Sequence, residues 1–301
     1  MTVHDLKSGI TTDRLPDGLN ISAALGNFDG VHIGHASLIS MLMNPENKGV
    51  PSVWYISDLP SKGPLLSTEE DKLDQFGKLG IRYAISENFE NIRDLSPDDF
   101  FRSVLIDRLN CRTVACGFNF SFGKHASGSA SDLERLSDIF GISCMIAPPY
   151  MFNGSPVSSS RIRSALSEGD TELAASMLGR RYSISSSVKE GDGIGRDMGF
   201  PTVNFELDPA QAFPKPGVYA SLCMGMPSVT NIGTRPTVTD GDLMTCETHI
   251  IDFSGDIYGK RISVEFIKRL RDERKFNNIE ELSEQIERDV KIAGSIISDN
   301  T

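Results

Sequence analysis

Residues 21–35 read ISAALGNFDGVHIGH. The run Ile21–Leu25 is short, apolar and followed by glycine, which predicts a buried strand that ends in a turn. Apolar side chains then recur at helical spacing from Ala36 to Met43, which predicts a helix. A strand, a glycine turn and a helix in this order are typical of the first unit of a parallel α/β sheet.

The same alternation continues through the first half of the chain. Further short apolar runs predict strands at Val53–Ile56, Ile81–Ile85, Thr113–Cys116 and Ser143–Ala147. Helical patterns lie between them at Glu69–Leu79, Pro97–Leu109 and Ser131–Phe140. Strands and helices at this spacing indicate βαβ crossovers, so we expect a Rossmann-like, mostly parallel sheet.

The second half changes character after two helical segments, Ile162–Leu166 and Leu173–Leu178. Serines at 183 and 185–187 open a stretch rich in glycine and proline, and short strand patterns follow at Val218–Cys223, Met244–Ile251 and Arg261–Phe266. About six short strands separated by turn residues predict a small antiparallel β-barrel. We therefore expect two domains, residues 1–182 and residues 183–301.

A helix is expected to close the chain. Four apolar residues recur at helical spacing behind Asn278, namely Ile279, Leu282, Ile286 and Val290. Glu281 stands three residues after Asn278, where a capping box would place it.

Composition favours a globular protein and excludes several functions. The 301 residues carry 30 basic and 41 acidic side chains, a net charge of −11, which argues against a partner with a phosphate backbone such as nucleic acid. No apolar run approaches the roughly 18 residues that span a bilayer, and the first ten residues lack a signal-peptide layout, so we expect no membrane partner and a cytoplasmic protein. Five cysteines without a CxxC pair predict reduced thiols rather than disulfides or a zinc site.

The decapeptide Gly26–His35 carries the first candidate site. Glycines at a strand-to-helix turn let backbone N–H groups approach an anion. His32 and His35 lie one helical turn apart and can donate to the same polyphosphate, while Gly34 between them removes a side chain that would block the approach. The spacing also permits metal ligation, but no third ligand stands out. A nucleotide site is therefore expected here.

These residues resemble a known family. GNFDGVHIGH is similar to the HxGH signature of the nucleotidyltransferase superfamily, in the form found in the FMN adenylyltransferase half of bacterial bifunctional riboflavin kinase/FAD synthetases. The resemblance implies that His32 and His35 are catalytic. It also implies that ATP is bound by the residues around them, Gly26, Asn27, Phe28 and Gly34.

Two further segments carry the same resemblance. VSSSRIR, residues 157–163, resembles the motif ISSTxxR, which implies that Ser158, Ser159, Ser160 and Arg163 hold the ATP phosphates that leave as pyrophosphate. A serine-rich loop that caps a helix is the alternative for this segment alone. GFNFSFGK, residues 117–124, resembles GxNFxFG and implies that Asn119 belongs to the FMN and phosphate site.

The chain departs from the family pattern at two places. Ser160 stands where threonine is usual, a mild change because the hydroxyl is kept. VWYISDLP, residues 53–60, lacks the FDPHP element that commonly follows the second strand. The second departure bears on how well FMN is adenylylated.

The run Gly191–Asn204, GDGIGRDMGFPTVN, carries the second candidate site. It is no Rossmann fingerprint, because the third glycine is one position late and a proline follows where a helix would begin. Thr202 and Asn204 share one face if the segment is extended, and their oxygens suit Mg²⁺ held mainly by phosphates.

Further along, Met244–Asp252 alternates so that Glu247 and His249 share one strand face, while Cys246, Thr248 and Ile250 share the other,. Glu247 can thus serve as a general base. A solvated surface glutamate is the alternative. His249 is given no role.

The C-terminal half resembles the riboflavin kinase domain over nearly its whole length, through GFPTVN, PKPGVYA, NIGTRPTV, CETHIIDF, DIYGKRI and LRDERKF. The resemblance implies that Thr202 and Asn204 contact Mg²⁺ and ATP phosphates and that Glu247 activates the ribityl 5′-hydroxyl. The neighbouring residues of the loop would bind ATP, namely Gly193, Gly195, Gly199 and Pro201. Three residues would flank the flavin, Arg271, Glu273 and Phe276.

Together these motifs imply a bifunctional transferase that converts riboflavin and ATP to FMN and ADP, and then FMN and ATP to FAD and pyrophosphate, with Mg²⁺ in both steps. One alternative is a riboflavin kinase whose nucleotidyltransferase half is weak or regulatory. Another is a non-catalytic protein that binds flavins or nucleotides and delivers flavins to apoproteins.

Overall fold

The computed structural model describes residues 1–58, 63–189, 200–236 and 242–299. The chain forms two compact units, one made of residues 1–62 and 69–158 and the other of residues 63–68 and 159–301. The boundary predicted between residues 182 and 183 lies inside the second unit, because the two helices before it group with the barrel. As a boundary between functional domains it stays a prediction.

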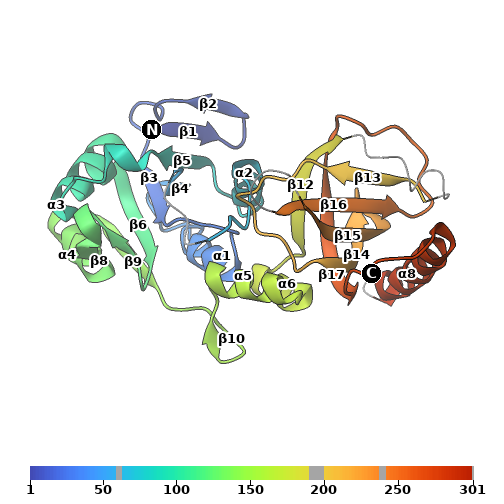
Figure 1. Cartoon of the computed structure of the whole chain (residues 1–301). Helices are drawn as coiled ribbons and strands as arrows, with labels where there is room; N and C mark the ends of the chain where they lie inside the picture. The colour runs from blue at the N-terminus through green and yellow to red at the C-terminus, as the bar shows by residue number, and fades with distance from the viewer. Residues whose placement is uncertain (59–62, 190–199, 237–241, 300–301) are drawn as a thin grey trace. The chain divides into compact units, whose positions relative to one another are not determined.

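The first unit contains a seven-stranded sheet (Figure 1). Its order is β2 (Ile10–Thr12), β1 (Thr2–Asp5), β5 (Tyr83–Glu87), β4 (Val50–Ile56), β3 (Ile21–Leu25), β6 (Cys111–Gly117) and β9 (Ser143–Ala147). The five strands from β5 to β9 are parallel, and the hairpin of β1 and β2 adds an antiparallel edge. The predicted parallel sheet is confirmed. Strand order reverses between β3 and β6, and ligands of such sheets bind at the carboxyl ends of the strands beside that reversal.

Apolar layers cover both faces of this sheet. Ile21, Ala23 and Leu25 of β3 join one hydrophobic cluster and Ala24 joins the other, as alternation along a strand requires. The main helices of the unit are α1 (Ile33–Met41), α2 (Glu69–Lys78), α3 (Pro97–Phe100), η2 (Phe101–Arg108) and α4 (Ala130–Phe140). Short elements complete it: η1 (Phe89–Asn91), η3 (Lys124–Ala126), and the hairpins β7 (Ser121–Phe122) with β8 (Gly128–Ser129) and β10 (Met151–Phe152) with β11 (Ser155–Pro156). The single helix predicted over 97–109 is thus an α-helical turn continued by a π-helical segment.

The second unit is built on a closed antiparallel barrel (Figure 1). Its strands follow in the order β12 (Tyr182–Lys189), β13 (Thr202–Phe205), β16 (Asp242–Ile250), β15 (Met226–Pro236), β14 (Gly217–Cys223) and β17 (Arg261–Arg271), which pairs with β12 again. The described residues of this unit also form the helices α5 (Ser159–Glu168), α6 (Thr171–Leu178) and α8 (Ile279–Asp299). The predicted barrel and closing helix are confirmed.

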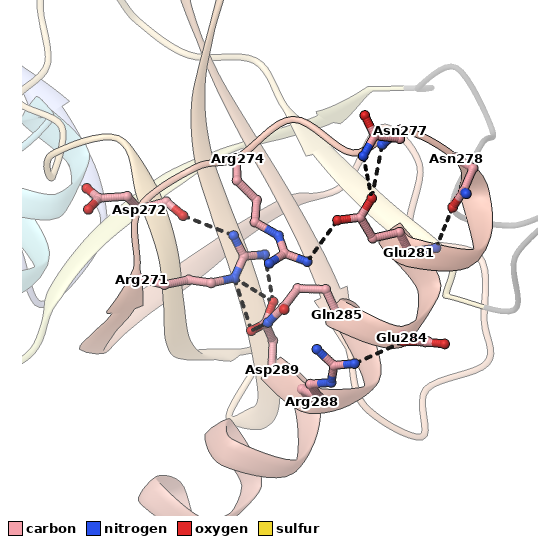
Figure 2. A network of polar contacts seen from close by, with 10 residues as sticks. All are labelled: Arg271, Asp272, Arg274, Asn277, Asn278, Glu281, Glu284, Gln285, Arg288 and Asp289. Atoms are coloured by element: carbon pink, nitrogen blue, oxygen red, sulfur yellow. Dashed lines mark hydrogen bonds and ion pairs between the residues drawn. The ribbon is translucent and has the colours of Figure 1, made fainter.

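Helix α8 is fixed to the barrel by a buried ion pair (Figure 2). Arg271, at the end of β17, donates through Nε and Nη2 to the carboxylate of Asp289, whose side chain is 3% exposed. Gln285 donates to the same carboxylate at 2.8 Å. Asn278 caps the helix by accepting from the backbone N–H of Glu281 at 2.8 Å. The Glu281 side chain accepts from Asn277 rather than from Asn278, so the predicted capping box is displaced by one residue.

All five cysteines are free thiols, as the sequence predicts, and four of them are buried. Burial raises the pKa of the Cys116 thiol to about 12, which keeps this group protonated and unreactive at neutral pH. In the described part of the chain, no helix combines the length and the apolar composition that crossing a bilayer takes.

Gly49 precedes β4 at a place where a side chain does not fit. A Cβ there would lie 2.5 Å from the carbonyl carbon of Ile21 and 2.6 Å from the nitrogen of Ser22, both backbone atoms of β3. We expect Gly49→Ala to lower the free energy of unfolding of the first unit by about 1–3 kcal/mol, as overpacking does. Trp54, the one tryptophan of the sequence and 3% exposed, reports that unfolding in urea by its fluorescence.

Gly77 supplies the matched control. It lies inside α2, and an added Cβ meets nothing within 4 Å. Gly77→Ala is expected to raise the free energy of unfolding by up to about 1 kcal/mol, because alanine is the better helix former. Equal effects of the two substitutions on the Trp54 transition would contradict this account of Gly49.

Candidate active sites

The loop between β3 and α1 has a backbone that burial and hydrogen bonds hold in place. The N–H of Gly26 donates to the Trp54 carbonyl of β4 at 3.2 Å, and the N–H of Val31 donates to the Phe28 carbonyl at 3.1 Å. Phe28 and Val31 have φ of +55° and +39°, a conformation that is rare for a β-branched residue. Both side chains are buried. The loop is therefore held in one conformation by the packing of its own side chains.

The two histidines form one stacked pair at the start of α1. His32 is the N-cap residue, and its Nδ1 accepts from the backbone N–H of His35 at 3.2 Å. Nδ1 therefore carries a lone pair, and the proton of a neutral His32 lies on Nε2. The rings are 3.6 Å apart and inclined by 11°. A Cβ on Gly34 would lie 3.2 Å from the His32 ring, so glycine there leaves room for the pair itself.

His35 is uncharged at neutral pH. Burial, then the neighbouring His32 and then Lys72 hold the pKa of His35 well below its usual value. The Phe28 ring meets the His35 ring edge-on at 5.2 Å. An uncharged imidazole still donates one hydrogen bond, from the ring nitrogen that carries the proton. Each ring of the pair can therefore donate to a phosphate oxygen.

Most of the predicted nucleotide residues lie at this loop. Gly26, Asn27, Phe28 and Gly34 belong to the loop or to the first turn of α1, and the Asn27 side chain is exposed. Asn119 is exposed in the turn after β6, the strand that pairs with β3 across the order reversal. Both segments follow the carboxyl ends of neighbouring parallel strands, where a ligand site is expected.

The serine and arginine motif falls at the junction of the two units. Ser158 ends the first unit, and Ser159, Ser160 and Arg163 belong to the second. Helix α5 begins at Ser159, three residues before the predicted helix. The Nε of Arg163 donates to the Pro64 carbonyl at 2.6 Å. The role of these four residues toward ATP phosphates stays a prediction.

A buried lysine, which the sequence analysis missed, lies in the region of the missing FDPHP element. Tyr55 of β4 donates through its hydroxyl to Glu69 of α2, and burial together with this bond raises the Tyr55 pKa. Lys72 has its ammonium 3.6 Å from Glu69 and 4.9 Å from the centre of the Tyr55 ring. Only a tertiary structure could bring it to notice, because its sequence context is an ordinary charged helix. Residues 59 and 60 of the departing segment lie outside the described part.

Strand register brings the predicted kinase residues together on the barrel. In the ladder of β13 and β16, Thr202 pairs with His249 and Asn204 pairs with Glu247. Cys246, Thr248 and Ile250 of β16 are buried, while Glu247 and His249 are half-buried. Directly paired residues share one face of a sheet. Thr202, Asn204 and Glu247 therefore lie side by side on the face away from those buried side chains.

Two more polar residues join this face. Asn231 of β15 pairs with Glu247 from the other side, and its Nδ2 donates to Oε1 of Glu273 at 3.3 Å. His249 Nδ1 lies 3.0 Å from the Pro201 carbonyl, which can only accept, so Nδ1 carries a proton. This hydrogen bond from His249 holds the backbone of Pro201, the residue before Thr202, in place. The sequence could have pointed to His249, because the alternation along Met244–Asp252 groups it with Glu247 on one strand face.

The structure describes only some of the remaining predicted kinase residues. Gly193, Gly195 and Gly199 lie outside the described residues. Phe276 lies 4.5 Å from the guanidinium of Arg274 and 6.0 Å from that of Arg271. Arg271 is engaged by Asp289 (Figure 2), so it anchors the segment that carries Glu273 and Phe276. A flavin contact of these three residues stays a prediction.

The donor set on the barrel fits a magnesium ion. Thr202 and Asn204 offer a hydroxyl and an amide oxygen on one face, and hard oxygens of this kind complete the coordination of Mg²⁺ bound chiefly by phosphates and water. Among the described residues, no three His, Cys, Asp or Glu side chains gather as a metal-binding group.

Both halves of the chain match models of known protein families. A family model described as FAD synthetase matches residues 17–161, and one described as riboflavin kinase matches residues 178–297. The bifunctional riboflavin kinase/FMN adenylyltransferase of Bacillus subtilis is 37% identical over 285 residues, 88% of this chain and 89% of its own length. The protein of that name from Listeria monocytogenes is 33% identical and covers 93% of each chain.

A solved structure extends the likeness to the fold. It is described as a macrolide-efflux protein from Streptococcus pneumoniae, is 25% identical, covers 96% of this chain and 97% of its own, and has a TM-score of 0.83. The matches to both halves support the bifunctional interpretation over a kinase with an idle nucleotidyltransferase half. The chain therefore belongs to the bifunctional riboflavin kinase/FMN adenylyltransferase family.

Proposed function

We propose that Glu247 is the general base of riboflavin phosphorylation and that His32 and His35 are the hydrogen-bond donors of FMN adenylylation, in a chain that performs both reactions with ATP. The register that sets Asn204, Glu247 and Asn231 side by side supports the first assignment most directly. The stacked pair at the start of α1 supports the second.

In the kinase reaction, the 5′-hydroxyl of riboflavin attacks the γ-phosphorus of ATP. A new O–P bond forms, the bond from that phosphorus to the β,γ-bridging oxygen breaks, and ADP leaves. The hydroxyl proton passes to the Glu247 carboxylate, which accepts it as the oxygen becomes bonded to phosphorus. Thr202 and Asn204 would hold Mg²⁺, which when bound supplies charge neutralisation on the phosphate oxygens.

The barrel interior keeps these residues in place. Ser221, Thr230 and Thr248 form a buried chain of hydroxyl groups, with oxygen distances of 2.7 and 2.9 Å. This chain links β14, β15 and β16 behind the face that carries Glu247 and Asn231. A reacting group on such a rigid support needs little reorganisation to reach its working position.

In the adenylylation reaction, a phosphate oxygen of FMN attacks the α-phosphorus of ATP. The bond from that phosphorus to the α,β-bridging oxygen breaks, and pyrophosphate leaves. An ionised phosphate has no proton to give up, so the reaction needs donors rather than a base. The Nε2–H of His32 is such a donor, and charge stabilisation of this kind is the usual main contribution to phosphoryl and nucleotidyl transfer.

A chromatographic time course with riboflavin, ATP and Mg²⁺ tests the whole proposal. We expect FMN to appear first and then to convert to FAD. FMN that accumulates without FAD would contradict the adenylylation half of the proposal and would leave a riboflavin kinase with an idle or regulated nucleotidyltransferase half.

Removal of divalent cations is expected to stop both reactions, because neither set of protein donors neutralises the triphosphate alone. The measurement is FMN and FAD formation in excess EDTA, followed by restoration with excess Mg²⁺. Trp54 fluorescence recorded in the same samples shows that the first unit stays folded. Continued FMN formation in EDTA would contradict the assignment of Thr202 and Asn204 as metal ligands.

A further inference from the structure

His249 contacts the two residues that lead into the kinase face. Its Nδ1 donates to the Pro201 carbonyl at 3.0 Å, and its ring meets the Phe200 ring at 5.4 Å, with an angle of 81° between the ring planes. Both contacted residues lie immediately before β13, which begins at Thr202. One imidazole therefore holds this segment through a hydrogen bond to its backbone and an edge-to-face contact with a side chain.

The beginning of β13 is paired less fully than its end. In the described part of the chain, β12 pairs with the last two residues of this four-residue strand, whereas β16 pairs with the first three. The residue of β16 directly opposite Thr202 is His249 itself. The position of Thr202 therefore depends on β16, and above all on the residue whose side chain also reaches the segment before it.

A proline at position 201 makes the carbonyl bond more important. Pro201 has no N–H to donate to a neighbouring strand, so its carbonyl is the backbone polar group through which this residue can be held. The carbonyl of Pro201 and the N–H and Cα of Thr202 lie in one planar peptide unit. A hydrogen bond that fixes the carbonyl therefore also fixes the backbone from which the Thr202 side chain projects.

We propose that His249 is a positioning residue for Thr202. Its bond to Pro201 orients the peptide unit that joins Pro201 to Thr202, and so keeps the Thr202 hydroxyl on the face that it shares with Asn204 and Glu247. The consequence for the binding of Mg²⁺ and ATP rests on the proposed function of Thr202 and Asn204. The hold on the backbone does not.

Two uncharged substitutions separate the hydrogen bond from the rest of the side chain. Asparagine has its amide nitrogen where histidine has Nδ1, while glutamine has its amide nitrogen one bond further out, near the position of Nε2. Both remove the contact with the Phe200 ring. We expect His249→Asn to keep the bond to the Pro201 carbonyl and His249→Gln to lose it.

Hydrogen–deuterium exchange of the ligand-free full chain, followed by mass spectrometry, measures how readily β13 opens. In His249→Gln we expect the backbone amides of Thr202–Phe205 to exchange about three- to tenfold faster, the range that the net contribution of one hydrogen bond gives. In His249→Asn the same amides should stay within about twofold of the unsubstituted protein. Strand β14 in the same samples should keep its exchange rate and so show that the barrel is folded.

FMN formation supplies the second measurement. We expect His249→Gln to raise the KM for ATP in the presence of Mg²⁺ by about three- to tenfold, with a smaller change in kcat, because Glu247 keeps its own place on β16. His249→Asn should restore the KM. FAD formation from supplied FMN should be unchanged in both variants, since it takes place in the other half of the chain.

Equal exchange rates of β13 in the two variants would overturn the proposal, because the variants differ in where the amide nitrogen lies. If His249→Gln fails to fold, as faster exchange in β14 would reveal, nitrogen NMR of the unsubstituted protein decides. A His249 ring with its proton on Nε2 alone would then overturn the proposal, and the loss of its signal in His249→Asn assigns it.

Thr202→Val separates a failure of this proposal from a failure of the proposed function. A KM for ATP that rises in Thr202→Val but not in His249→Gln would overturn the positioning role of His249. A KM that Thr202→Val leaves unchanged would remove Thr202 as a metal ligand, and the exchange rates of β13 would still decide whether His249 holds the strand.

Discussion

Glu247→Gln is expected to lower the rate of FMN formation from riboflavin by about 10²–10⁴-fold, the usual contribution of a general base. Glutamine has the same shape and keeps a polar group between Asn204 and Asn231, but it cannot accept the hydroxyl proton. FAD formation from supplied FMN should be unchanged, because it takes place in the other half of the chain. Both rates are measured by chromatography of the same variant.

Glu265→Gln is the control for this prediction. Glu265 is also a strand glutamate of the barrel, half-exposed and 3.6 Å from Arg181, and nothing places it near the proposed reaction. Riboflavin binding, followed by quenching of flavin fluorescence, should survive in Glu247→Gln. FMN formation within a few-fold of the unsubstituted rate would show that the hydroxyl needs no protein base or that another residue supplies it.

The sequence predicts the first unit well because its signals are local. Strand β3 matches its expected bounds, since a run of five residues, four of them apolar, is flanked by a polar residue and a glycine. Helix α1 begins three residues earlier than expected, at Ile33, because the His32 side chain caps it. A histidine cap is not a pattern that sequence reasoning looks for.

Elements that depend on pairing were harder to foresee. The serines at 183 and 185–187 suggest a loop, yet they lie in β12, where Ile184 and Val188 are buried and pairing with β17 supplies the backbone hydrogen bonds. The hairpin strand β2 is fully exposed and exists only because β1 offers it a partner. In both cases tertiary context overrides a weak local preference.

The two candidate sites also differ in how far the local sequence predicts them. The histidine pair is contained in ten consecutive residues, so its motif and its place after β3 could be predicted, whereas the His32 cap and the stacking of the two rings come from the structure. The kinase face is assembled from β13, β15 and β16, and the neighbours of Glu247 follow from register alone. Asn231 and Lys72 were missed because one depends on strand pairing and the other on burial, and neither property can be read from the residues on either side.

Substitution of both histidines by alanine is expected to lower FAD formation from FMN by at least about 10²–10³-fold, the effect of losing one preorganised donor to a developing charge. The effects of the two rings should not add, because they are stacked and act as a unit. His32→Ala also removes the cap of α1, so Trp54 fluorescence must show that the first unit stays folded.

FMN formation from riboflavin in the same double variant is the internal control and should be unchanged, since the barrel carries its own reacting residues. His125→Ala, an exposed histidine of the same unit, should leave both activities as they are. Loss of both activities in a folded double variant would contradict two independent sites, because a defect at the start of α1 has no reason to reach Glu247 unless the two reactions share a residue. Loss of FAD formation alone would place nucleotidyl transfer at the histidine pair and phosphorylation elsewhere, as the separate positions of the two motifs in the chain require.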